Sequence, residues 1–361
     1  MTDLFQPLTL ASGAVMKNRL MLAPLTNTQS HADGTLSDEE FRWLTMRAEG
    51  GFGLTMTCAA HVQRRGQGFP GQLGIWSDDH LPGLKRLADK IKSEGSLAVV
   101  QLHHAGIRSP KELIGETPVG PSDHAETGSR ALSLEEVHQL RDDFIAAAVR
   151  AEKAGYDGVE IHGAHGYIVC AFLSPGLNKR EDAYGGSAEN RARLLNEIID
   201  GVRAATKPGF TLGVRLSPER FDLDMEEIRT LAGAILTGGK VDFLDMSLWD
   251  VFMEPGDARF KGKRLIDVFT ALPRKNCVLG VAGKVRSAKE ARACLEAGAD
   301  YALIGRAAIL HHDWPKLAAA NPDFEPVATP VPASYLAKEG ISPVFVSYLD
   351  QYFKMVAKDA A

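Results

Sequence analysis

Two histidines and a tyrosine stand close together in the segment Gly158–Tyr167, which reads G-V-E-I-H-G-A-H-G-Y. An apolar, strand-like stretch leads into His162, His165 and Tyr167, and only glycine and alanine separate these three. Such small residues pack little and let the backbone turn, so the turn presents its large polar groups. Two N–H donors beside a phenol suit a reaction that builds negative charge on a substrate oxygen and then delivers a proton. A structural histidine pair beside a packed tyrosine is the alternative, because motifs this short recur by chance.

The elements that position these groups alternate between strand and helix along the chain. Predicted strands cover residues 19–25, 53–59, 97–102, the first half of 158–167, 211–217, 243–248, 277–282 and 301–305. Predicted helices cover about residues 37–49, 81–94, 133–151, 187–205, 225–236, 264–272 and 287–297, several of them opened by Ser-x-x-Glu capping boxes. Apolar strands between helices indicate a parallel α/β sheet, and eight units indicate closure into a single (β/α)8 TIM barrel. An open doubly wound sheet is the competing fold, but its usual Gly-rich fingerprint does not follow the first strand.

Length and composition limit the class of protein. The 361 residues fit one barrel domain over residues 1–320 and a proline-rich extension over residues 321–361, expected to pack on the barrel or at a subunit contact in a homo-oligomer. A net charge of −5 with scattered basic residues argues against a nucleic-acid partner. We see no leader segment and no long apolar span, so we expect a cytoplasmic protein without a membrane partner. The four cysteines lack metal-ligand spacing, so we expect neither a metal site nor a disulfide framework.

Side chains at the carboxyl ends of barrel strands share one mouth, where barrel enzymes hold their ligands. Gln101 and Arg215 lie in otherwise apolar strands, and a buried arginine needs a partner. A bound heteroaromatic ring would satisfy both, because glutamine offers a donor and an acceptor and arginine a cation for a ring that becomes anionic on reduction. A structural pairing with a carboxylate such as Glu160 or Asp245 is the alternative.

The segments after the seventh and eighth strands are typical of a phosphate site. Gly283 and Gly305 permit close approach of backbone N–H groups to an anion, and Lys284 and Arg306 supply positive charge. The alternative is that Gly305 only ends a strand and Arg306 begins a solvated helix. The occurrence of both pairs after these two strands favours the phosphate site.

Five longer stretches carry a resemblance to a known family. They are K-N-R-L-M-L-A-P-L-T (17–26), L-G-I-W-S-D (73–78), Q-L-H-H-A-G (101–106), E-I-H-G-A-H-G-Y (160–167) and F-L-S-P-G-L-N-K-R-E-D-A-Y-G-G-S-A-E-N-R (172–191). Across about residues 3–310 the chain resembles the old yellow enzyme family of FMN-dependent ene-reductases. The resemblance implies non-covalent FMN at the barrel mouth, reduced by NADPH or NADH. It also implies hydride transfer from flavin N5 to the activated C=C bond of a small α,β-unsaturated carbonyl or nitro compound.

The resemblance further implies roles for individual residues. At the FMN it places Gln101 and Arg215 on the pyrimidine edge, Pro24, Leu25, Thr26 and Ala59 beside the ring, and Ala282, Gly283, Lys284, Gly305 and Arg306 around the phosphate. His162 and His165 would hold the substrate oxygen, and Tyr167 would protonate the carbon alpha to it. Thr26 and Thr28 stand where one bacterial branch has cysteine and tyrosine, and the tail lacks that branch's arginine-plus-tryptophan ending. These departures leave the flavin potential, the oligomeric state and the substrate pocket open.

Two rival functions accompany this interpretation. A non-catalytic FMN-binding protein or sensor would show no turnover with NADPH and an enone. A metal-dependent barrel hydrolase would use His162, His165 and Glu160, but it usually needs further ligands on other strands. The first strand, R-L-M-L-A-P-L, offers none.

Overall fold

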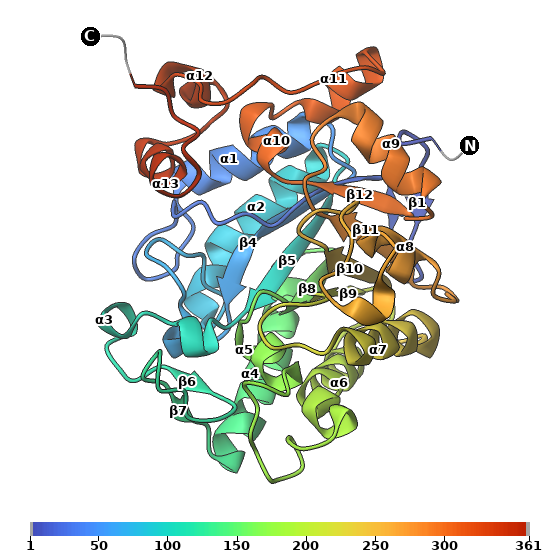
Figure 1. Ribbon diagram of the computed structural model, residues 1–361. Helices are drawn as coiled ribbons and strands as arrows, with labels where there is room; N and C mark the ends of the chain where they lie inside the picture. Colours follow the sequence, from blue (N-terminus) through green and yellow to red (C-terminus); the bar gives the residue numbers. More distant parts are fainter. Residues whose placement is uncertain (1–2, 359–361) are drawn as a thin grey trace.

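The computed structural model describes residues 3–358, and its centre is a closed barrel of parallel strands (Figure 1). In barrel order the strands are β3 (Leu20–Leu22), β4 (Leu54–His61), β5 (Leu97–His103), β8 (Gly158–Gly163), β9 (Thr211–Leu216), β10 (Phe243–Ser247), β11 (Val278–Ala282) and β12 (Tyr301–Ile304), which pairs with β3 again. Every neighbouring pair is parallel. The eight-stranded barrel predicted from the sequence is confirmed.

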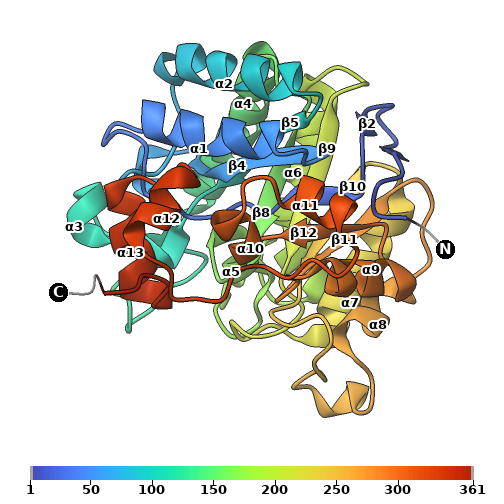
Figure 2. The same ribbon diagram turned by 90° about the horizontal axis from the view of Figure 1, so that it is seen from above.

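Helices follow the strands and cover the outside of the barrel (Figure 2). They are α1 (Asp38–Glu49), α2 (Leu81–Ser93), α4 (Leu134–Lys153), α6 (Ala188–Ala205), α7 (Met225–Gly238), α8 (Leu265–Thr270), α9 (Ala288–Glu296), α10 (Arg306–Leu310) and α11 (Trp314–Ala320). The predicted capping boxes open α4 and α9. At α1 only half of the box forms, because Ser37 accepts the N–H of Glu40 while the Glu40 carboxylate turns inward and accepts from Asn27, Ser30 and Cys58.

The protein has two apolar cores, one inside the barrel and one between the barrel and the helical layer. The interior core contains inward-facing strand residues such as Met56, Val99 and Phe243, and the N-terminal hairpin of β1 (Leu8–Thr9) and β2 (Val15–Met16) packs against it. The larger core fills the space between the sheet and the helices. Alternation along parallel strands produces this division, since successive side chains point to opposite faces.

Two connections carry additional short elements. The segment after β5, predicted to be long and irregular, contains the single-turn helix η3 (Gly106–Arg108), α3 (Lys111–Ile114) and the paired strands β6 (Val119–Gly120) and β7 (Arg130–Ala131). The connection after β8 begins with α5 (Ile168–Leu173), which the sequence pattern did not predict.

The C-terminal extension contains α12 (Ala333–Lys338) and α13 (Pro343–Phe353), which lie beside α1 (Figures 1 and 2). The ring of Phe345 packs edge-on against Trp43, with 5.7 Å between the centroids. The buried guanidinium of Arg47 donates to the carbonyl oxygen of Glu339 at 2.7 Å. These contacts fix the extension against the barrel. No helix within residues 3–358 is long and apolar enough to cross a membrane.

Candidate functional site

One cavity of about 590 Å³ opens at the carboxyl ends of the barrel strands. Its lining includes the fourteen residues to which the family resemblance assigns a role: Pro24, Leu25, Thr26, Ala59, Gln101, His162, His165, Tyr167, Arg215, Ala282, Gly283, Lys284, Gly305 and Arg306. A cavity of this size suits a cofactor or a small molecule. A bulge in β4 after Met56 shifts the register so that Ala59 pairs with Gln101 at this mouth.

The two histidines meet at the end of β8. His165 has a left-handed backbone, with φ of 61°, and its N–H donates to the Ser217 hydroxyl at 3.0 Å. This turn brings His165 Nδ1 to 3.3 Å from His162 Nε2, and His165 Nε2 lies 2.7 Å from the hydroxyl of Ser247. Gly166 must be glycine here, because a Cβ would lie 2.8 Å from the ring of Phe221.

Both histidines are held in the neutral form. Burial lowers the pKa of His162 and of His165 well below the usual value. Positively charged neighbours, among them Arg215 and Arg108, lower both pKa values further. A neutral imidazole carries one N–H donor, so the pair can donate to a substrate oxygen without carrying charge into the cavity.

Tyr167 lies between two side chains that the sequence analysis did not assign. The ring of His103 stands edge-on to it with 4.3 Å between centroids, and the Arg108 guanidinium lies 4.8 Å from its centroid. Arg108 also donates to the backbone oxygen of His165 at 2.6 Å. His103 lies in the motif Q-L-H-H-A-G (101–106), which was the available signal for it, whereas Arg108 lies two residues beyond that motif.

The sequence left two alternatives open for Gln101 and Arg215, a bound ring or a structural pairing with a carboxylate. The structure gives a different answer for each residue. Gln101 Nε2 donates to Glu160 Oε1 at 2.6 Å, so the structural pairing is present for glutamine. Arg215 lies next to Asp245 in the strand register, yet within the described residues it forms no ion pair, and its Nε is buried without a partner. A buried guanidinium whose Nε–H has no hydrogen-bond partner suits a ligand that places an acceptor beside it.

The far end of the cavity is shaped for an anion. A Cβ at Gly283 would lie 2.9–3.1 Å from the backbone of Trp249 and Asp250, so only glycine fits there. Lys284 has a left-handed φ of 55° and pairs with Asp250 at 3.1 Å. Partial burial and the charge of Arg286 lower the pKa of Arg306. The basic groups crowd here as they would around a phosphate, and sequence reasoning missed Arg286 among them.

The cavity is lined by positively charged side chains, although the chain as a whole has a net charge of −5. Among its described lining residues are five basic side chains, and none is acidic. They are Arg108, Arg215, Lys284, Arg286 and Arg306. The donor set at the ring-edge end and the glycine cradle with its cations at the other end fit FMN, as the sequence resemblance implies. Residues 3–358 contain no cluster of three or more His, Cys, Asp or Glu side chains that could hold a metal ion.

The C-terminal extension completes one wall of the cavity. Tyr348, Leu349 and Phe353 from α13 line it, and burial raises the pKa of Tyr348, which lies beside Thr26. Neither spacing nor composition pointed to these residues, because their position depends on contacts across nearly the whole length of the chain.

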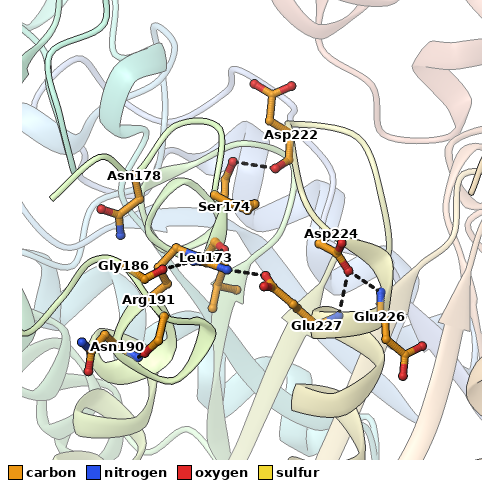
Figure 3. A network of polar contacts seen from close by, with 12 residues as sticks. Leu173, Ser174, Asn178, Gly186, Asn190, Arg191, Asp222, Asp224, Glu226 and Glu227 are labelled. Atoms are coloured by element: carbon orange, nitrogen blue, oxygen red, sulfur yellow. Dashed lines mark hydrogen bonds and ion pairs between the residues drawn. The ribbon is translucent and has the colours of Figure 1, made fainter. Parts of the chain in front are cut away.

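The long motif at residues 172–191 forms a polar network with residues 222–227 (Figure 3). Arg191 donates to the Leu173 carbonyl oxygen at 3.1 Å and pairs with Glu227, while the Ser174 hydroxyl donates to the carbonyl oxygen of Asp222 at 3.0 Å. Residues 220–222 have left-handed φ angles of 68°, 53° and 54°, which side chains other than glycine rarely adopt. The network therefore holds a strained turn, and Phe221 of this turn lines the cavity.

Comparisons with known proteins identify the family of the chain. Residues 3–322 match the model of the NADH:flavin oxidoreductase / NADH oxidase family. A probable NADH-dependent flavin oxidoreductase of Bacillus subtilis is 38% identical over 322 residues, which cover 86% of each chain. An NADPH dehydrogenase of Bacillus licheniformis is 36% identical over 324 residues, 88% of this chain and 94% of that protein. The solved structure of the old yellow enzyme homologue from Zymomonas mobilis superimposes with a TM-score of 0.79 at 29% identity, covering 92% of this chain and 98% of that one. The chain therefore belongs to the NADH:flavin oxidoreductase family of old yellow enzyme relatives, which use FMN with NADH or NADPH.

Proposed function

We propose that this enzyme reduces the activated C=C bond of α,β-unsaturated carbonyl or nitro compounds with electrons from NADPH or NADH. The observation that carries the proposal is the meeting of two neutral histidines and a tyrosine in the same cavity as Arg215 and the cationic cradle. This arrangement offers hydrogen bonds to a developing oxyanion and a proton source beside it.

Several side chains would hold the cofactor at the barrel mouth. Bound FMN would supply the redox chemistry, which is hydride transfer from the nicotinamide and on to the β carbon of the alkene. Gln101 and Arg215 would hold its pyrimidine edge, where Arg215 would stabilise negative charge. The ring would lie beside Pro24, Leu25, Thr26 and Ala59. The phosphate would be bound by Ala282, Gly283, Lys284, Gly305 and Arg306.

His162 and His165 act on the substrate oxygen. Each donates its one N–H to the carbonyl or nitro oxygen in place of the hydrogen bond between the two rings, and the hydrogen bonds to the substrate strengthen as negative charge moves onto that oxygen. Hydrogen bonds to charged groups contribute about 1.5–3 kcal/mol each. Tyr167 gives its hydroxyl proton to the α carbon, so the two hydrogens of the product come from the cofactor and from this phenol.

An anaerobic titration tests the proposal. The purified protein should carry FMN, whose visible absorbance NADPH or NADH bleaches. Addition of 2-cyclohexenone should restore the absorbance in a one-to-one ratio and yield cyclohexanone. A non-catalytic FMN-binding protein or sensor would keep its reduced spectrum after the enone is added, and that result would refute the proposed function.

A further inference from the structure

Below the cavity, the barrel interior contains two carboxyl groups that the proposed reaction does not use. Glu160 on β8 and Asp245 on β10 are each 0% exposed. Strand β9 lies between their strands and places Arg215 beside Asp245 in the register. The two carboxyl groups are close enough to hydrogen-bond to each other. Two ionised carboxylates in such contact, away from water, would repel strongly.

Their hydrogen-bond partners leave one oxygen of each group unsatisfied. Glu160 Oε1 accepts from Gln101 Nε2 at 2.6 Å, and Asp245 Oδ1 accepts from the hydroxyl of Tyr301. Glu160 Oε2 and Asp245 Oδ2 are buried and have no donor within residues 3–358. If both groups were ionised, both oxygens would stay unpaired at a high desolvation cost, whereas one proton between them satisfies both.

We propose that Glu160 and Asp245 share one proton at neutral pH, carried on Glu160 Oε2 and donated to Asp245 Oδ2. The hydrogen bonds then run in one direction, from the Gln101 amide to Glu160 and from Glu160 to Asp245. Tyr301 donates to the same carboxylate. The pair carries a single negative charge, which offsets the positive charge of Arg215.

The electrostatic surroundings favour the shared proton. Burial and the charge of Asp245 raise the pKa of Glu160 well above its usual range, and burial raises the pKa of Asp245. The other titratable groups near the pair, within the described chain, are Arg215 from β9, Tyr301 from β12 and Cys277 before β11. Burial keeps the last two neutral, raising the pKa of Tyr301 well above its usual value and that of Cys277 to about 12. Arg215 therefore supplies the positive charge that the pair offsets.

The shared proton has a consequence for the cavity, and this consequence alone rests on the proposed function. Because Glu160 engages the amide nitrogen of Gln101, the amide oxygen remains as the acceptor that Gln101 offers to the cavity. An N–H group on the edge of the bound ring would find that acceptor. Glu160 is thus a positioning residue, which fixes the orientation of Gln101 without lining the cavity itself.

Infrared spectroscopy of the FMN-loaded enzyme tests the proton directly. The difference spectrum of the parent minus Glu160→Gln at pH 7 should contain the C=O band of a protonated carboxylic acid, which shifts in D2O. The same band should appear against Asp245→Asn, since Glu160 then ionises beside Arg215. Difference spectra without this acid band overturn the proposal. If one variant fails to fold, the difference against the other still decides, because both variants remove the same proton and any band from Glu40, whose pKa burial also raises, cancels in either difference.

Unfolding measurements give a second test that needs no turnover. The folded parent keeps a proton that the unfolded chain loses above pH of about 4.3, so its stability relative to Glu160→Gln falls as pH rises. The ratio of the two unfolding constants should change about tenfold per pH unit until the raised folded pKa is reached. A ratio independent of pH contradicts the shared proton. Neither the infrared nor the unfolding test measures enone reduction, so both can be interpreted even if the proposed function is wrong.

The flavin midpoint potential tests the charge assignment. Each single amide variant, Glu160→Gln or Asp245→Asn, leaves one negative charge beside Arg215. The double variant leaves none, so its midpoint potential should lie well above that of the parent and of both single variants. A single variant that raises the potential as far as the double variant would contradict the single shared charge.

Discussion

Replacing Tyr167 by phenylalanine removes one oxygen from the cavity and leaves the ring contacts in place. The ring lies against the edge of His103 and beneath the Arg108 guanidinium, and neither contact requires the hydroxyl. Fold, FMN content and the rate of flavin reduction by NADPH should therefore be retained. Reoxidation by an enone should slow by about 100-fold or more, because a positioned general acid contributes factors of this size. The loss corresponds to about 2.7 kcal/mol of transition-state stabilisation.

Rapid-mixing measurements of the two half-reactions separate these effects. Nitroalkenes should slow less than enones in hydride transfer, since the nitronate is stable enough to leave the site and be protonated in water. Tyr335→Phe is the matched control, because its hydroxyl donates to the Leu310 carbonyl oxygen away from the cavity, and it should slow neither half-reaction. Equal slowing of both half-reactions by Tyr167→Phe would show that the phenol shapes the site and does not donate the proton.

Three further predictions concern the cofactor, the substrate oxygen and acid stability. Arg215→Ala should lower FMN retention or the flavin midpoint potential, and full occupancy with an unchanged potential would contradict its role. His162→Ala and His165→Ala should each weaken the binding of phenols, whose phenolate oxygen mimics the substrate oxygen, by about tenfold or more in a spectral titration. Burial lowers the pKa of His104 to about 3, so this histidine stays neutral in the fold while the unfolded chain binds a proton below pH of about 6.5. Stability should fall as pH drops from about 6.5, and His104→Gln should lose less than the parent between pH 7 and pH 5 in urea unfolding. Equal losses would contradict the neutral histidine.

The sequence predicted the barrel because its strands are short, apolar and regularly separated by capped helices. It also predicted a common site, since the ends of parallel barrel strands must meet. His162 and Arg215, which are neighbours in the register of β8 and β9, are 53 residues apart in the chain and still line one cavity. Strand order alone determines this proximity, and strand order follows from the repeating pattern.

Features that depend on tertiary contacts were not predictable in the same way. Ser37 and Glu40 have capping-box spacing, but the Glu40 carboxylate finds buried donors and leaves the box incomplete. Tyr348 reaches the cavity because Phe345 packs on Trp43, a contact between segments about 300 residues apart. No local pattern specifies such a contact, so the wall formed by α13 appears only in the folded chain.

Isotope transfer from the nicotinamide tests the central claim most directly. NADPH deuterated at both C4 positions, used to reduce an enone in ordinary water, should give a ketone with one deuterium on the β carbon and none on the α carbon. Unlabelled NADPH in D2O should place deuterium on the α carbon, where the Tyr167 proton arrives. Nuclear magnetic resonance of the product distinguishes the two positions. Deuterium from the nicotinamide on the α carbon, or no reduced ketone despite bleaching of the flavin, would contradict the account.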